Sequence, residues 1–462
     1  MQERRYLSTG SPAAFVLWHA LSIHPMTALR RNNQPHEKFI PGALPMNLLP
    51  LVDARYDRNT MAVLKLMLNE FPWDERYRVH DLEQILTPAL VVYPELIASN
   101  IERTLALLSG DADRWRVHIK TAKLGYTVHM LIERGVRNFK CATTLELITA
   151  SDAGAADVLL AYPVMGANAR RVREIADQFP RTKISVLAEN DQQVAQWRES
   201  RVGVFLDINP GMNRTGIAVS ERDRVCSLIR QVQNEALEFR GLHYYDGQYG
   251  GLAEPQRSAA AHAGYDQLLE LVRTCEQQGL NIPELITAGT PTFPASLSYA
   301  GFTNRFIHRI SPGTIVYGDA TSLAQLPALY GYAPAALVLT RVVSHPRHGI
   351  ITCDAGHKTV SADAGVPTCI VVGHSGMSPL SPSEEHLPIE VTEGSSVAVG
   401  ESLFLLPRHI CPTVNNFDSA LLARDGRITM VEKISARGRE GPLLGQFGYL
   451  GGNSSPAVSQ RS

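Results

Sequence analysis

A repeating strand–helix pattern fills the middle of the chain and constrains its fold more than any other feature. Eight segments are apolar enough to be buried strands, and each is followed by a helical or loop segment: 116–120, 138–144, 158–164, 184–189, 202–208, 239–245, 284–288 and 305–310. Alternating strands and helices build a parallel sheet covered by the helices. Eight such units predict a (β/α)8 barrel. A doubly wound open sheet is the rival fold, but no GxGxxG motif follows the first strand, so we favour the barrel.

The residues on either side of this repeat differ from it. Past residue 330, short apolar segments are broken by glycine and proline with almost no helical periodicity, which predicts a mostly β-domain. Residues 1–85 are irregular, and a buried strand at 89–93 leads into the first helix. The predicted organisation is an N-terminal extension of unassigned role (1–85), the barrel (86–330), the β-domain (331–450) and a disordered tail (451–462).

The whole-chain composition excludes several classes of partner. With 462 residues and a hydrophobic fraction of 44%, the chain is typical of a globular protein with more than one domain. A net charge of −1 gives no sign of a polyanion partner, so we expect no nucleic acid. No apolar run reaches the ~18 residues that span a bilayer, so we expect no membrane association. The 6 cysteines form no CxxC pair, which favours a reduced, cytoplasmic location.

Two glycine- and threonine-containing loops follow the last two predicted strands. Gly289, Thr290 and Thr292 come after the seventh strand, and Gly313 and Thr314 come after the eighth. The loops after these two strands often bind phosphate in barrels. Glycines allow close backbone approach, and threonine hydroxyls are donors. Either loop alone is explained by ordinary turn chemistry, but the two together predict a phosphate site.

A lysine stands at the end of the first predicted strand, on the same rim of the barrel. Lys120 follows the alternation of Val117 and Ile119. A rim lysine is usually a surface charge, but beside a phosphate site it is what a Schiff base with an aldehyde needs. Phosphate and Schiff base together indicate pyridoxal 5′-phosphate (PLP). Arg214, after the fifth strand, is either a solvated cation or a ligand for an anionic oxygen of cofactor or substrate.

The segment Pro407-Arg408-His409-Ile410-Cys411-Pro412-Thr413 contains a possible metal clip. In an extended segment, residues two apart point to the same side, so His409 and Cys411 could hold one ion. Imidazole and thiolate suit Zn²⁺ better than Mg²⁺. Two protein ligands are fewer than the usual three of catalytic zinc, so water and substrate would complete the shell.

Eight short motifs occur in the order found in a known family. They are HIKT from His118, GMNRTG from Gly211, YDG from Tyr245, GTPT from Gly289, PGT from Pro312, DAG from Asp354, SEEH from Ser383 and PRHICPT from Pro407. In this order they resemble the D-threonine aldolase/D-serine dehydratase family of fold-type III PLP enzymes, relatives of alanine racemase. The resemblance covers roughly residues 86–440.

This resemblance implies a set of site residues. Lys120 would bind PLP covalently, the GTPT and PGT loops would hold its phosphate, and Arg214 would face its phenolic oxygen. Tyr245 would be a further cofactor contact. His409 and Cys411 would hold a divalent metal, Zn²⁺ or another such as Mn²⁺. Relatives of this fold type often pair head to tail, so the resemblance also implies a homodimer.

The chain departs from the family pattern at two positions near the expected pocket. Many relatives have a histidine where Ala122 stands, and some have one at the position of Gln248. Substrate choice therefore does not carry over from the family. Among the other histidines, His118 and His243 lie on predicted barrel strands and are the two whose surroundings matter most.

The predicted function is a PLP- and metal-dependent lyase that acts on a small D-3-hydroxy amino acid. Dehydration of the D-serine type, giving a 2-oxo acid and ammonia, is favoured because family aldolases more often have aspartate where Cys411 stands. Retro-aldol cleavage of the D-threonine aldolase type, giving glycine and an aldehyde, is the alternative. An amino-acid racemase is a second alternative, which would need no metal.

Overall fold

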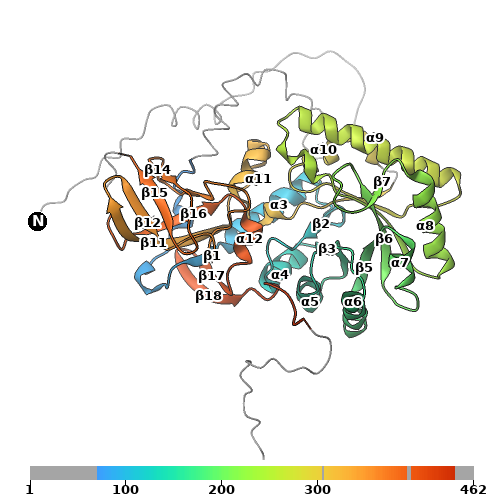
Figure 1. The fold of residues 1–462 in the computed structure, drawn as a ribbon, viewed down its shortest axis with the longest axis horizontal. Coiled ribbons are helices and arrows are strands. Elements are labelled where there is room, and N and C mark those ends of the chain that lie inside the picture. The colour runs from blue at the N-terminus through green and yellow to red at the C-terminus, as the bar shows by residue number, and fades with distance from the viewer. Residues whose placement is uncertain (1–69, 304–305, 393–396, 443–462) are drawn as a thin grey trace, which may run out of the picture. The chain divides into compact units, whose positions relative to one another are not determined.

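The computed structural model describes residues 70–303, 306–392 and 397–442, all within one compact unit of the chain. Two sheets organise these residues (Figure 1). One is the parallel sheet of a barrel. The other is a mostly antiparallel sheet built largely from strands after residue 335. Within the described ranges, no helix is both long and apolar enough to cross a bilayer.

Eight parallel strands form the barrel sheet, and each of them overlaps one of the eight predicted strands. In sheet order they are β2 (Arg116–His118), β3 (Asn138–Cys141), β4 (Asp157–Leu160), β5 (Lys183–Ala188), β6 (Gly203–Asn209), β8 (Phe239–Tyr244), β9 (Glu284–Thr287) and β10 (Ile307–Ile310). A two-residue strand, β7 (Ile217–Ala218), lies beside β6. The predicted (β/α)8 barrel is confirmed.

Helices connect these strands and cover the outside of the barrel (Figure 1). They are α3 (Pro94–Leu107), α4 (Gly125–Glu133), α5 (Thr144–Asp152), α6 (Ala167–Gln178), α7 (Asp191–Ala195), α8 (Arg222–Asn234), α9 (Gln256–Gln277), α10 (Phe293–Ser298) and α11 (Ala320–Gln325). Each of the longer helices buries one apolar face against the strands; in α3 this face includes Ile97 and Ile101. Pro94 at the first position of α3 fixes where that helix begins.

The sheet closes where β10 meets β2. Trp115, just before β2, bridges to Ile310, and its Nε1 donates to the carbonyl oxygen of Pro312 at 2.9 Å. The loop after β10 lies so close to β2 that a Cβ on Gly313 would come 2.2 Å from the carbonyl oxygen of His118. Only glycine allows this approach, so Gly313 is required for closure of the barrel as well as for any ligand.

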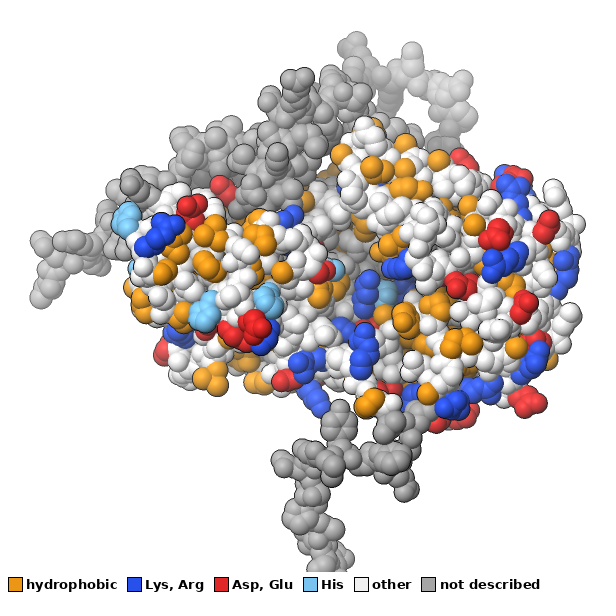
Figure 2. Space-filling view, in the orientation of Figure 1, with side chains coloured by type: hydrophobic (Ala, Val, Ile, Leu, Met, Phe, Trp, Pro, Cys, Tyr) orange, Lys and Arg blue, Asp and Glu red, His pale blue; other side chains and the backbone are white. Residues whose placement is uncertain are grey.

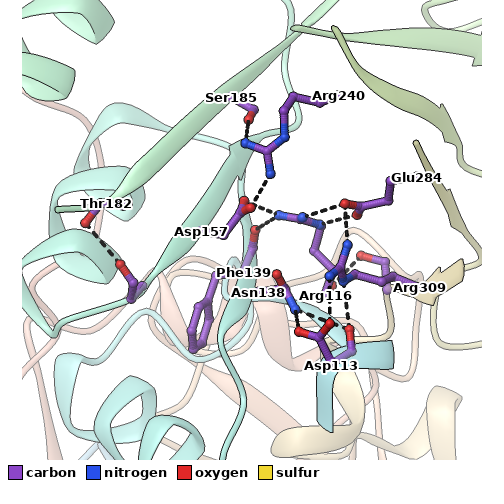
Figure 3. A network of polar contacts seen from close by, with 12 residues as sticks. Asp113, Arg116, Asn138, Phe139, Asp157, Thr182, Ser185, Arg240, Glu284 and Arg309 are labelled. Carbon is purple, nitrogen blue, oxygen red and sulfur yellow. Dashed lines mark hydrogen bonds and ion pairs between the residues drawn. The ribbon is translucent and has the colours of Figure 1, made fainter. Parts of the chain in front are cut away.

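Five charged residues, which we call the barrel floor, close the N-terminal ends of the strands (Figure 3). The guanidinium of Arg116 is fully buried; its Nη1 lies 2.7 Å from Asp157 Oδ1 and its Nε 3.0 Å from Glu284 Oε1. Arg240 also pairs with Asp157, and Arg309 with Glu284. Each carboxylate therefore faces two guanidinium groups. Burial alone would raise the pKa of Asp157, but its two arginine partners lower it below its ordinary value.

The second sheet contains β1 (Ala89–Val92), β11 (Ala336–Arg347), β12 (Ile350–Cys353), β13 (Cys369–Val371), β14 (Met377–Pro379), β15 (Leu387–Val391), β16 (Ser402–Pro407), β17 (Ser419–Arg424) and β18 (Arg427–Lys433). A short helix, α12 (Ile410–Val414), follows β16. β1 precedes the barrel in sequence but pairs antiparallel with β11 and parallel with β17. The chain therefore starts in the second sheet, builds the barrel and then returns.

Residues 70–85 are tied to the second sheet. Tyr77 is buried, and its hydroxyl donates to the carbonyl oxygen of Pro334 at 3.0 Å. The backbone N–H of His80 donates to the carbonyl oxygen of Gly426 at 2.7 Å. The last part of the predicted N-terminal extension is thus packed against the fold. Residues 1–69 and the predicted tail 451–462 lie outside the described residues.

Candidate active site

Lys120 lies at the C-terminal end of the barrel strands, where the fold places chemistry. β2 ends at His118, and Lys120 follows two residues later with a half-buried side chain. The backbone N–H of Lys120 donates to His118 Nδ1 at 3.3 Å. This contact holds the His118 ring beside the lysine at the mouth of the barrel.

The two predicted phosphate loops contribute unequally to a neighbouring pocket of about 170 Å³. Thr290 and Thr314, one from each loop, line it together with Arg408 and His409. Thr292 is directed elsewhere: it is fully buried, and its hydroxyl donates to Asp246 Oδ1 at 2.5 Å. The hydroxyl of Thr292 therefore braces the loop, and its predicted contact with a phosphate stays a prediction.

Tyr245 and Arg214 meet beside the same loops. The guanidinium carbon of Arg214 lies 4.9 Å from the centroid of the Tyr245 ring, a cation–π distance. A Cβ on Gly289 would come 2.7 Å from this ring, so glycine there lets the tyrosine pack against the loop. Gln248 follows closely in sequence, and its Oε1 is buried without a hydrogen-bond partner among the described residues. An unpaired buried acceptor next to these groups is consistent with a missing ligand.

A third cation, Lys140, was not predicted. It lies on β3 with a 2% exposed side chain, and its Nζ is 5.7 Å from the Tyr245 ring centroid. The same Nζ is 3.4 Å from His243 Nε2 on β8, and His243 Nδ1 is 2.7 Å from Asp207 Oδ1 on β6. A lysine between Phe139 and Cys141 in a predicted buried strand was the sequence signal that could have identified it.

The predicted metal clip has a different local geometry from the one expected. His409 is the N-cap of α12 and Cys411 lies in the first turn of that helix, so the segment is not extended. Pro412 fits there because the first turn of a helix needs no N–H from it. The two side chains nevertheless lie close enough for each to shift the pKa of the other. The backbone N–H of Ile410 donates to Asp319 Oδ2 at 3.0 Å, which anchors the clip to the start of α11.

The clip lies against the segment that carries Lys120. The Sγ of Cys411 is 3.1 Å from the hydroxyl of Thr121 and 3.7 Å from that of Thr314. Burial raises the pKa of the Cys411 thiol, but the hydrogen bond and charge of His409 and the charge of Lys120 lower it below its ordinary value overall. The structure therefore brings the predicted lysine and clip together.

The donor atoms of the clip fit a divalent ion. Burial lowers the pKa of His409, yet its bond to Cys411 and its 2.6 Å contact from Nδ1 to Asp363 Oδ2 raise it to about 9. Each side chain thus shifts the pKa of the other, and a metal would take the place of the proton on this pair. Asp363 orients the ring in the way that a carboxylate behind a metal-binding histidine does in many metal sites. The described residues include no group of three or more His, Cys, Asp or Glu side chains suited to a metal.

The other groups fit a flat anionic coenzyme. An amine (Lys120), two further cations (Lys140 and Arg214) and two pocket hydroxyls (Thr290 and Thr314) lie at one end of the barrel. Lysine and arginine side chains also gather around the hollow in the centre of the face in Figure 2. A phosphate and a phenolate would offset this positive charge.

Comparison with known proteins agrees with this geometry. The family model for the N-terminal domain of alanine racemase matches residues 93–321, and the model for a putative serine dehydratase domain matches residues 335–423. The chain belongs to the D-threonine aldolase/D-serine dehydratase family of alanine racemase-like, fold-type III enzymes. The predicted resemblance, and with it the prediction of an enzyme, is confirmed.

Individual members of the family are distant in sequence. A 3-hydroxy-D-aspartate aldolase of Paracoccus denitrificans (strain Pd 1222) is 26% identical over 378 residues, which cover 78% of this chain and 94% of that protein. A D-threonine aldolase of an Arthrobacter species is 26% identical over 377 residues, covering 77% and 94%. The crystal structure of D-threonine aldolase from Filomicrobium marinum has a TM-score of 0.69 at 24% identity, covering 76% and 96%. This last likeness supports the shared fold.

Proposed function

We propose that the chain is a PLP- and divalent-metal-dependent lyase of D-3-hydroxy amino acids and that it acts as a dehydratase of the D-serine type. One observation carries the proposal. The hydroxyl of Thr121, the residue after Lys120, lies 3.1 Å from the Sγ of Cys411. A lysine that could hold an aldehyde and a thiolate–imidazole pair that could hold a Lewis acid therefore lie side by side.

Each group in the pocket has a task in this reaction. PLP, when bound, supplies the electron sink that stabilises negative charge at Cα. Lys120 is the residue that would hold it. In the reaction, the amine of Lys120 would accept the Cα proton. Arg214 supplies positive charge for an anionic oxygen. Thr290 and Thr314 offer hydroxyls to a phosphate.

The clip would act on the other end of the substrate. His409 and Cys411 would hold a divalent ion, Zn²⁺ by the chemistry of the two donors, as a Lewis acid for the β-hydroxyl. Loss of the Cα proton and the β-hydroxyl, followed by hydrolysis, converts D-serine into pyruvate and ammonia. Lys120 and the clip would act on the two bonds that change, at Cα and Cβ respectively.

The choice of dehydration rests on Cys411 and on the match to a putative serine dehydratase domain over residues 335–423. Retro-aldol cleavage is the second candidate because the two curated relatives are named as aldolases. In that reaction a base takes the proton of the β-hydroxyl and the Cα–Cβ bond breaks. Lys120 could serve as this base, so both reactions use the same groups.

Product analysis tests the proposal. The purified protein, reconstituted with PLP, is incubated with D-serine and D-threonine with and without Zn²⁺ or Mn²⁺. We expect pyruvate from D-serine and 2-oxobutyrate from D-threonine, with ammonia in equal amounts. Glycine and acetaldehyde from D-threonine without any 2-oxo acid would show that the aldolase alternative is correct. Dialysis against a chelator should remove lyase activity, whereas a racemase would keep its activity.

A further inference from the structure

We propose that Lys140 is a second acid–base group of this site, and that His243 and Asp207 form a proton relay behind it. The inference rests on the proposed function, because the proposed lyase reaction is the one in which Lys140 would act. It goes beyond that function because the reaction as described uses Lys120 alone for proton transfer.

The surroundings of Lys140 differ from those of the other buried lysine near the site. Lys123 is also buried, but its Nζ forms an ion pair with Glu146 at 2.6 Å. Lys140 has no carboxylate within ion-pair distance among the described residues, and its nearest polar partner is His243 Nε2 at 3.4 Å. A buried amine without a counter-ion is costly to stability when charged. Lys123 is therefore a structural lysine, and Lys140 needs another explanation.

The groups that face Lys140 make its neutral form accessible. They are Lys120, Arg116, Arg214, His118, His243, Asp207 and Asp246. Burial is the main cause that lowers the pKa of Lys140, to about 7, and the charges of Lys120 and Arg214 lower it further, against the opposing charge of Asp207. Near neutral pH the amine can both accept and donate a proton, which is the property of an effective general acid–base group.

The relay behind Lys140 has a defined direction. Asp207 Oδ1 lies 2.7 Å from His243 Nδ1, and Asp207 Oδ2 accepts the hydroxyl of Thr215 at 2.7 Å. The carboxylate favours the tautomer with the proton on Nδ1, which leaves the lone pair of Nε2 facing Lys140. Burial and the charge of Lys140 lower the pKa of His243, which favours the neutral imidazole, and its Nε2 can then accept a proton from Lys140. A carboxylate, an imidazole and a reactive group in this order repeat the logic of a catalytic triad.

Lys140 also points toward the predicted coenzyme residues. Its Nζ lies over the ring of Tyr245, which Arg214 also contacts, and it is close enough to Lys120 for the two charges to affect each other. A proton on Lys140 is therefore available at the reacting end of the pocket. Protonation of the product carbon or of the departing hydroxyl would consume it, and the proton that Lys120 takes from Cα would replace it. In the opposite direction, the Nε2 lone pair of His243 would accept a proton from Lys140.

The test combines a spectroscopic measurement with kinetics. The protein is labelled with ¹⁵N-histidine, and the Nε2 shift of His243 is followed from pH 5.5 to 9 in the PLP-loaded and PLP-free states. We expect the Nε2 chemical shift of His243 to change in a step with a midpoint near pH 7, and we expect no such step in Lys140→Met. The matched control Lys123→Met, which removes the ion-paired lysine, should keep the step. A flat His243 profile in the wild type, or the same step in Lys140→Met, would overturn the proposal.

Kinetics separate this proposal from the proposed function. In a working lyase, Lys140→Met should lower kcat by about 10²–10⁴-fold and remove the limb of the pH profile near 7. His243→Gln, which keeps a hydrogen-bonding side chain, should shift that limb without an equal rise in KM. If Lys140→Met retains kcat within about threefold with an unchanged pH profile, the role of Lys140 is refuted while the lyase stands. If no D-3-hydroxy amino acid reacts but the His243 step depends on Lys140, the proposed function fails and the acid–base pair stands.

Discussion

The two ends of the barrel differ in whether their buried charges are paired. At the N-terminal end, the carboxylates of Asp157 and Glu284 each face two guanidinium groups, and Arg116 lies fully buried between them (Figure 3). At the C-terminal end, Lys120, Lys140 and Arg214 converge without equivalent carboxylate partners among the described residues. The charges of the barrel floor are therefore paired, whereas the positive charges at the mouth of the same barrel are not.

This difference distinguishes charges that belong to the stable fold, at the floor, from charges that could serve function, at the mouth. A charge network in which every member is paired can be buried without a ligand, because each desolvated group has partners. Cations that lack partners are costly in an empty site and become favourable when an anionic molecule binds. The charges of the floor are complete by themselves, whereas those of the mouth would become favourable with a negatively charged ligand.

The largest effect should come from removing the amine at the mouth. Lys120→Ala should abolish lyase activity and the absorbance band of the lysine-bound coenzyme, since Lys120 is the amine proposed to hold it. Spectra between 300 and 500 nm during titration with PLP would check this. An unchanged band in Lys120→Ala would show that another lysine holds the coenzyme.

The next largest effect should be on stability, with unequal results at the two ends. Arg116→Met leaves Asp157 and Glu284 short of a partner and should lower the free energy of unfolding by about 3–5 kcal/mol. Lys140→Met removes an unpaired amine and should leave the stability of the PLP-free protein within about 1 kcal/mol of wild type, or raise it. Denaturant unfolding of both variants measures this. Equal destabilisation by the two changes would contradict the contrast between floor and mouth.

A smaller effect, on metal affinity, is expected from changing Asp363, which contacts His409 of the clip. Asp363→Asn removes the carboxylate that holds His409 Nδ1 at 2.6 Å. Metal affinity should fall by about 10–100-fold, as for other residues that orient a metal ligand. Competition with a zinc-binding dye would report the affinity. Asp418, which pairs with Arg437 away from the clip, provides a matched control through Asp418→Asn, which should leave zinc binding unchanged.

A further effect is a pH dependence of the stability of the PLP-free protein. The pKa of Lys140 is lowered from 10.5 to about 7, chiefly by burial. Between these values the unfolded chain binds more protons than the folded one, so this group makes stability rise with pH across that window. Below pH 7 its penalty is constant. Unfolding at pH 7 and pH 9.5 should show this rise in wild type and a smaller rise in Lys140→Met; equal slopes would refute it.

Much of the fold could be predicted because its signals are local. Each of the eight strand–helix units carries its own periodicity, and the motifs around Lys120 and Cys411 are short. The floor could not be predicted, because Arg116 and Glu284 are 168 positions apart and only the closed barrel brings them together. The pairing of β1 with β11 and β17 is non-local for the same reason.

The candidate site was predicted in outline but not in detail. Lys120, Arg214, Tyr245 and the clip were identified from motif order, whereas the helical geometry at Cys411 depends on the anchor at Asp319, which no local pattern indicates. The contact of Thr292 with Asp246 could not be predicted, because it joins two separate loops. Lys140 was missed because its partners come from β6 and β8. The homodimer and the cytoplasmic location stay predictions.

The most direct test of the account is to identify the lysine that binds the coenzyme. The PLP-loaded protein is reduced with borohydride, digested and analysed by peptide mass mapping. The account predicts a single modified peptide with the pyridoxyl group on Lys120 and none on Lys140, although both amines lie at the mouth of the barrel. Modification of Lys140 in place of Lys120, or of neither residue, would contradict it.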